Sequence, residues 1–134
     1  HRWFGRTYLA VGVLVGGTAG LYMSQYAFGG AMARLGFASL ATLWLYTGLR
    51  AYIAVRRGAV DEHRKWMLRN YSLTFAAVTL RFYLPASMAA GIEFSLAYPI
   101  IAWLCWLPNL AIVEWRYNNA HNSYTFKRDK FFLE

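Results

Sequence analysis

Four long stretches of mostly apolar residues run along the chain, and short polar segments separate them. They cover residues 8–28, 35–55, 66–90 and 94–113, and the first stretch contains no charged residue. Each is close to the roughly 20 residues that a helix needs to cross a hydrocarbon core of about 30 Å. Because open strands would leave backbone polar groups unpaired in lipid, the pattern predicts four membrane-spanning helices.

The connections between these stretches are short. Gly29 and Gly30 join the first two, residues 56–62 join the second and third, and residues 91–93 join the last two. Short links favour antiparallel neighbours, so we expect an all-α, up-down-up-down four-helix bundle. Residues 1–134 then form a single transmembrane domain, and its last part, residues 117–134, is a basic and aromatic cytoplasmic tail.

Charge is scarce and unevenly placed. Apolar residues make up 58% of the chain and charged residues only 15%, whereas soluble domains carry roughly a quarter. All 14 Lys and Arg residues except Arg34 and Arg81 fall on the side of the predicted bundle that holds both termini. The positive-inside rule therefore predicts that both termini are cytoplasmic.

The net charge of +8 has a simple explanation in this setting. The basic residues flank apolar stretches and form no separate module, which favours anionic lipid head groups as partners and argues against nucleic acid. The single cysteine, Cys105, excludes an internal disulfide. No nucleophile with a nearby base, zinc-type cysteine pair or phosphate loop is visible, so we expect a protein that is not an enzyme by itself. Because the sequence begins at His1 rather than methionine, we expect a processed or truncated chain, with an upstream helix as one alternative.

Two segments at the cytoplasmic starts of spans share the same order of residue types, with one insertion. The first span is preceded by HRWFGRTY from His1, and the third is opened by HRKWMLRNY from His63. The match predicts a duplicated helical hairpin, with halves related by an axis along the membrane normal. The alternative is the general enrichment of Arg, Trp and Tyr at cytoplasmic helix starts.

The sequence also resembles a known family through three segments, HRWFGRTYL, DEHRKWMLRNYSLTFAAVTLRFYLP and AWLCWLPNLAIVEW. They are similar to the predicted bacterial membrane proteins grouped as domain of unknown function twenty-three-oh-six, over nearly the whole chain. The resemblance implies a multi-pass protein of the bacterial inner membrane but no particular activity. A weaker similarity to four-helix membrane cytochromes implies haem b, although those proteins usually hold their ligand histidines within the spans. His1 and His63 instead lie at the cytoplasmic mouths.

A polar stripe is predicted on the third span. His63, Asn70, Thr74, Ala77 and Arg81 fall within about 40° of one line on a helix and cover about 27 Å of its length. Polar residues within a span usually face the bundle interior or a water-filled cavity, so the stripe is expected to point inward. It would line a cavity for a cofactor, a quinone-like ligand or a proton path, or else form a structural network that joins helices.

The candidate cofactor site combines histidines and arginines near the cytoplasmic side. His1 and His63 would be the ligands of haem iron or another metal, since neutral imidazole is a common ligand. The residues expected to bind acidic groups or complete the site are Arg2, Arg6, Arg64, Arg69 and Asn70. The alternative is that both histidines are only hydrogen-bonded to loops and water.

Other polar residues have structural predictions. Glu114 is expected to pair with Arg2, Arg6 or Arg69, with a proton relay as the alternative, and Arg81 is expected to pair with Glu93.

Three further features concern helix packing and helix ends. Gly12, Gly16 and Gly20 form small-xxx-small repeats that allow close approach of a neighbouring backbone or flat cofactor. Pro99 and Pro108 are expected to kink the fourth helix. Asp61 is the expected N-cap of the third helix.

Three functions fit these patterns. The first is a membrane protein with an intramembrane polar site that binds haem or a quinone-like ligand in electron transfer. The second is a structural or accessory subunit of a larger membrane complex or homo-oligomer, docked through the glycine face and the aromatic tail. The third is a small oligomeric transporter with a path along the stripe. An absorption spectrum would separate the first two.

Overall fold

The computed structural model describes residues 2–118, apart from the side chains of Arg2 and Arg6, and every element in this range is helical. The first helical run joins α1 (Arg2–Thr7), the π-helix η1 (Tyr8–Val15) and α2 (Gly16–Ser24). The second run is α3 (Gly30–Arg56). The third joins α4 (Val60–Thr74) and α5 (Ala76–Ala89), and the fourth joins α6 (Phe94–Leu104) and a helix over residues 107–118. His1 and most of the predicted tail lie outside the described residues.

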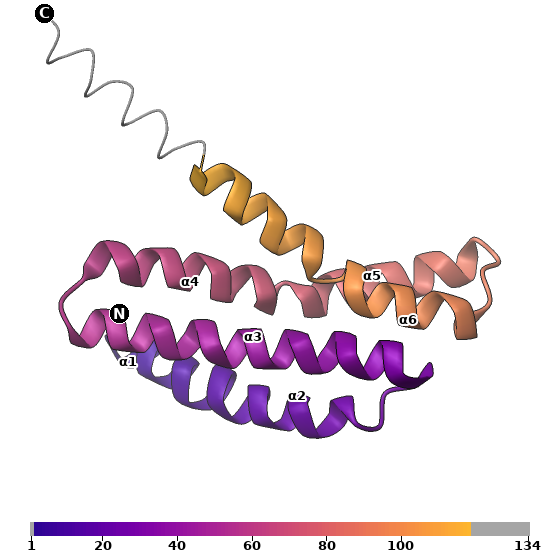
Figure 1. Cartoon of the computed structure of the whole chain (residues 1–134), viewed down its shortest axis with the longest axis horizontal. Helices are drawn as coiled ribbons and strands as arrows, with labels where there is room; N and C mark the ends of the chain where they lie inside the picture. The colour runs from indigo at the N-terminus through magenta and orange to yellow at the C-terminus, as the bar shows by residue number, and fades with distance from the viewer. Residues whose placement is uncertain (1, 119–134) are drawn as a thin grey trace, which may run out of the picture.

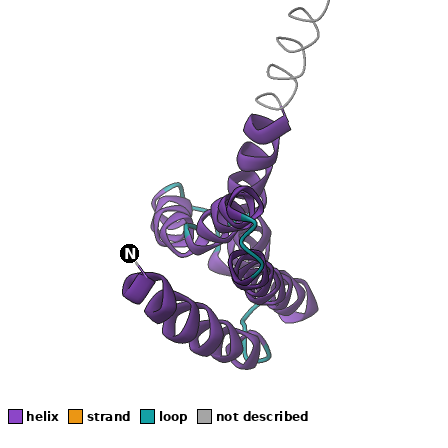
Figure 2. Ribbon diagram, turned by 90° about the vertical axis from the view of Figure 1, so that its left-hand side faces the viewer, coloured by secondary structure: helices purple, strands orange, loops and turns teal. Residues whose placement is uncertain are grey.

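The chain reverses direction at each connection between these runs (Figure 1). The first run lies along α3, and α4 with α5 lies along the other side of α3. In the view turned by 90°, the helical run that starts at the N-terminus lies to one side of the other helices (Figure 2). Residues 107–118 lean away from the axis of the other helices (Figure 1). The prediction of an all-α protein is therefore correct for the described residues.

The central helix is α3, which packs against the first run, α4 and α6. Its buried positions are small residues, namely Ala33, Gly36, Ala41, Thr47, Gly48, Ala51 and Ala54. Small side chains let helix backbones approach closely, which replaces the bulky apolar core of a soluble bundle. These small buried residues allow α3 to pack closely against the first run, α4 and α6.

Glycines make the closest contacts between the first run and α3. A Cβ atom at Gly16 would lie 3.2 Å from the ring of Trp44, and one at Gly20 would lie 3.5 Å from Ala41. Gly12, in contrast, faces only the ring of Tyr8 on its own helix. The tightest positions are Gly17 and Gly48, where a Cβ atom would lie 2.6 Å from Leu45 and Val13 respectively, and the small-residue spacing did not single out either of them.

The third and fourth runs are both interrupted where they meet. The third has a turn at Phe75, and the fourth has one at Cys105 and Trp106. Leu73, Ala76, Cys105 and Trp106 pack together as a buried cluster at these interruptions. Pro108 lacks the N–H group that would continue the helix, which accounts for the second interruption. α6 passes through Pro99 without a break, so only the kink expected near Pro108 is observed.

The start of α4 corrects one capping prediction. Its N-cap is Ala59 and no side chain caps it, so Asp61 lies inside the first turn. Gly58, with φ of 75°, turns the chain into the helix before the aspartate is reached. Asp61 and Glu62 still place negative charge near the positive end of the helix dipole.

Within residues 2–118, two helices are long and apolar enough to cross a bilayer, namely Trp3–Ser24 and Phe94–Asn118. They correspond to the first and fourth predicted spans. The break at Phe75 leaves α4 with 15 residues and α5 with 14, each shorter than a span. α3 has 27 residues but includes Arg34, Arg50 and Arg56, which lower its average hydropathy.

Candidate functional site

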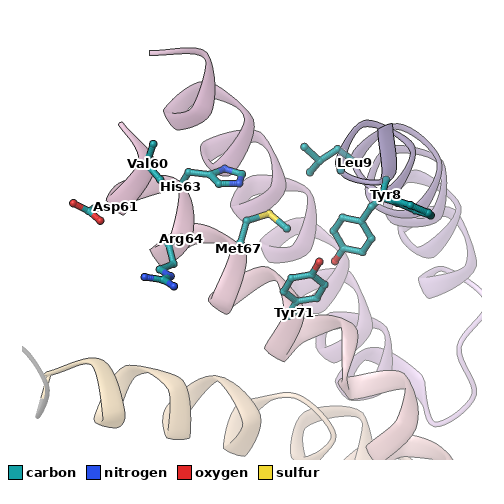
Figure 3. A pocket seen from close by; sticks show the side chains of 10 residues that line it. Tyr8, Leu9, Val60, Asp61, His63, Arg64, Met67 and Tyr71 are labelled. Atoms are coloured by element: carbon teal, nitrogen blue, oxygen red, sulfur yellow. The ribbon is translucent and has the colours of Figure 1, made fainter. Parts of the chain in front are cut away.

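A cavity of about 750 Å³ lies between the first run and α4. It is lined by Phe4, Gly5, Tyr8 and Leu9 from the first run and by Val60, Asp61, His63, Arg64, Met67 and Tyr71 from α4. Its volume falls within the range of roughly 300–1,000 Å³ that is usual for small-molecule sites. The walls are mostly apolar and aromatic, with few polar groups among them (Figure 3).

His63 is held in one orientation by the neighbouring helix. Its Nδ1 atom lies 2.8 Å from the backbone oxygen of Ala51 on α3. A carbonyl oxygen only accepts hydrogen bonds, so Nδ1 must carry the proton and donate it. In the neutral imidazole, Nε2 is then left as an acceptor, and no other described residue forms a hydrogen bond with it.

The charged residues of the cavity lie at its rim. Figure 3 shows His63, Met67 and Tyr71 facing Tyr8 and Leu9, whereas the charged ends of Asp61 and Arg64 point away from them. Asp61 and Arg64 are both exposed. The charged ends of Asp61 and Arg64 therefore lie outside the interior of the cavity, and its polar atoms come from His63 and the two tyrosines.

A hydrogen-bonded network closes the cavity on the side of Tyr8. The Tyr8 hydroxyl donates to Oδ1 of Asn70 at 2.7 Å and lies 2.8 Å from Oγ1 of Thr74. Asn70 Nδ2 donates to the Trp44 carbonyl and to Thr47 Oγ1, both at 2.8 Å. Trp44 Nε1 donates to Thr74 Oγ1 at 2.9 Å. The network therefore ties the first run, α3 and α4 together.

Asn70 is the centre of this network and is fully buried, with 0% of its surface exposed. Both its amide N–H groups and its oxygen have partners within the protein. It does not line the cavity. Satisfied polar groups of this kind fix the arrangement of helices, so the geometry favours the structural interpretation of Asn70 and Thr74.

The polar stripe predicted on the third helix is interrupted halfway. Asn70 is buried and Thr74 half-buried, but Ala77 and Arg81 are exposed. The prediction assumed one continuous helix with 100° of rotation per residue. The turn at Phe75 interrupts that helix, so residues before and after it no longer lie on one common face. Arg81 donates to the Ala77 carbonyl at 3.0 Å, and the predicted pair with Glu93 is not formed between these two described residues.

Arg69 is occupied by a different contact from the one proposed for acidic groups of a cofactor. Its Nε and Nη2 atoms donate to the two carboxylate oxygens of Glu114, the second at 2.9 Å, which confirms Glu114 pairing with one of the three predicted arginines. Its guanidinium also lies 4.8 Å from the ring centre of Trp66, and Arg50 lies at the same distance from that ring. Arg69 therefore joins the fourth run to α4 outside the cavity.

The Arg69–Glu114 contact predicts a measurable coupling between the two residues. In a double-mutant cycle of Arg69→Ala and Glu114→Ala, we expect a coupling energy of about 0.5–1 kcal/mol, since both side chains are partly exposed. Denaturation of the detergent-solubilised protein measures it. A matched cycle with Arg56→Ala, a cation on a different helix, should show no coupling to Glu114, and equal coupling in both cycles would contradict the assignment.

The structure thus brings together only part of the predicted cofactor site. His63 and Arg64 line the cavity, Arg69 and Asn70 do not, and His1 and the side chains of Arg2 and Arg6 lie outside the described residues. Within the described part of the chain, no group of three or more His, Cys, Asp or Glu residues could hold a metal ion.

Tyr8, Tyr71 and Met67 also line the cavity, although the sequence pattern did not mark them as ligand-binding. Tyr8 and Tyr71 occupy matching positions in the two similar segments, and this match is the feature of the sequence that could have identified them as site residues. In the structure their ring centres are 5.2 Å apart.

The fold and the cavity define a protein whose described part is helical, with two helices that suit a bilayer and a mostly apolar pocket between the first run and α4. The chain belongs to the family described as predicted membrane protein (DUF2306), which matches residues 1–116. Membership makes contact with a lipid bilayer a property of this protein. The function of this family is unknown, and the similarity to membrane cytochromes is not shown. No curated protein and no solved structure matches the chain.

Proposed function

We propose that the chain crosses the bacterial inner membrane four times as an up-down-up-down bundle, with both termini cytoplasmic. The reversals between consecutive runs and the family membership support this topology. The topology is also supported by the basic residues near the C-terminal end of α3 and the N-terminal end of α4, the two helix ends that residues 57–59 connect. The contact between the tilted rings of Tyr8 and Tyr71 supports a duplicated hairpin, because the matching tyrosines meet where the two halves pack together.

We propose that this membrane protein binds a quinone-like ligand, a flat ring with polar oxygens and an apolar tail, and so takes part in electron transfer. The observation that carries the proposal is the cavity in which the oriented imidazole of His63 faces apolar and aromatic walls. An aromatic ligand ring packs well against Tyr8, Tyr71 and Phe4, and the imidazole places one oriented polar group beside the oxygens of the ring.

Haem b is the alternative ligand for the same cavity. His63 Nε2 has the lone pair that iron requires, and hydrogen bonding of Nδ1 to a backbone carbonyl is the usual support of a ligating histidine. His63 is the one histidine among the described lining residues, so His1 would be the second histidine ligand expected from the sequence. A Soret band in the purified protein that disappears in His63→Ala would establish haem in place of a quinone.

Filling the cavity tests the proposal. The detergent-solubilised protein is titrated with a short-chain benzoquinone and its hydroquinone, and binding is followed by calorimetry. Gly5→Leu should weaken binding at least about tenfold, because Gly5 lines the cavity and a Cβ there meets no atom within 4 Å, which leaves room for the new side chain to occupy ligand space.

The matched control is Ala10→Leu, which adds the same side chain at an exposed position of the same run outside the cavity. It should bind as the unchanged protein does. If neither form of the probe binds saturably, or if both variants bind equally well, the proposal is wrong. Absence of any bound ligand would then favour an accessory subunit.

A further inference from the structure

We propose that the cavity selects the reduced, hydroxyl-bearing form of its ligand over the oxidised, carbonyl-bearing form. This inference rests on the proposed function and adds the chemical class that the site prefers, a hydroquinone or a similar phenol. The structural basis is that the fixed polar atom of the cavity wall is a hydrogen-bond acceptor and not a donor.

The tautomer of His63 is imposed from outside the cavity. Ala51 is completely buried on α3, and its carbonyl oxygen receives Nδ1 of His63 at 2.8 Å. Turning the ring over would bring a carbon atom to this carbonyl and lose the bond. The neutral ring therefore keeps its proton on Nδ1 and presents the lone pair of Nε2 as the free polar group.

None of the other described polar groups that line the cavity offers a ligand a fixed hydrogen-bond donor. The Tyr8 hydroxyl has its proton committed to Asn70 Oδ1 at 2.7 Å, so it offers no free donor to a ligand. The charged ends of Asp61 and Arg64 point away from the interior (Figure 3). Tyr71 is exposed, and its hydroxyl can both donate and accept, so it serves either form of a ligand equally.

A ligand hydroxyl and a ligand carbonyl therefore meet different environments at Nε2. The hydroxyl donates to the nitrogen and satisfies both groups. The carbonyl brings two lone pairs together, and both groups lose the water that solvated them without gaining a partner. Sites that are built to bond a hydroxyl reject analogues that lack it, because buried polar groups are left unpaired.

Two binding comparisons test the inference without requiring any change to the protein. The titrations are done anaerobically at a pH of about 8, where imidazoles are neutral. The unchanged protein should bind the short-chain hydroquinone about tenfold more tightly than the matching quinone. It should also bind it about tenfold more tightly than the hydroquinone dimethyl ether, which has the same ring but only acceptor oxygens.

Substitution of His63 separates its two nitrogen atoms. His63→Asn keeps an N–H group that can reach Ala51 and removes the acceptor at the position of Nε2, so the ratio of hydroquinone to quinone affinity should fall to about one. Gln25→Asn is the control, an amide change at an exposed turn position outside the cavity, and it should keep the full preference.

The outcomes distinguish the two proposals. If quinone, hydroquinone and dimethyl ether bind equally, or if the quinone binds best, the selectivity is overturned and ligand binding in the cavity stands. If none of the three binds, the proposed function itself fails. Should His63→Asn fold poorly, the comparison with the dimethyl ether in the unchanged protein still decides the matter.

Discussion

Replacing Asn70 with alanine should lower the free energy of unfolding by about 2 kcal/mol, the largest loss expected from one polar side chain. The asparagine side chain is fully buried and bonds Tyr8, Thr47 and the Trp44 carbonyl. Alanine leaves these three groups without the partner that now satisfies them. The loss can be measured by titrating the detergent-solubilised protein with a denaturing detergent and following the helical circular dichroism.

Asn118→Ala provides the matched control for this substitution. Asn118 is exposed at the end of the described chain, so its removal should change stability by less than about 0.5 kcal/mol. Tyr8→Phe removes one arm of the network and should give an intermediate loss. Similar stabilities for the Asn70 and Asn118 variants would show that the network is not formed in the folded protein.

Gly48→Ala is expected to destabilise the protein by about 2 kcal/mol, although alanine is the better helix former. The added Cβ atom would lie 2.6 Å from Cγ1 of Val13 and 3.4 Å from Nδ2 of Asn70. Val13 is buried and β-branched, so its side chain has little freedom to turn away. The first run must therefore move away from α3, which the same unfolding measurement detects.

A second substitution can rescue this defect. Val13→Ala removes the methyl group that meets the new Cβ atom, so the double variant of Val13→Ala and Gly48→Ala should be more stable than Gly48→Ala alone. Gly5→Ala is the control, because a Cβ atom there meets no atom within 4 Å, and it should be neutral or slightly stabilising. A Gly48→Ala variant as stable as Gly5→Ala would contradict the observed packing.

The sequence predicts the positions of the helical runs well because long apolar stretches mark the segments whose side chains are removed from water. It predicts their ends less well. The second stretch was predicted at residues 35–55, but α3 extends over Gly30–Arg56, since a helix continues through Arg34 and Arg56 beyond the apolar part. The break at Phe75 has no local signal, because neither proline nor glycine is adjacent to it. It depends on packing against the fourth run.

The candidate site was predictable only in part for a related reason. A histidine at the start of an apolar stretch is conspicuous, so His63 could be singled out from the sequence. Its partners depend on how two helices are rotated toward each other, which a single sequence does not specify. The same applies to Glu114, for which the pattern left three arginines open, and only the fold selects Arg69.

The paired interruptions at Phe75 and at Cys105–Trp106 have a mechanical consequence. Continuous helical hydrogen bonding is interrupted at one common level in two adjacent runs, and Asn109 spans that level by donating to Cys105 O at 2.9 Å and to Thr79 Oγ1 at 3.0 Å. Bending concentrates where a helix ladder is already interrupted. We therefore expect residues 107–118 to change their tilt at this joint rather than elsewhere along the run. In the membrane topology proposed above, we expect such a pivot to absorb hydrophobic mismatch in bilayers of unequal thickness.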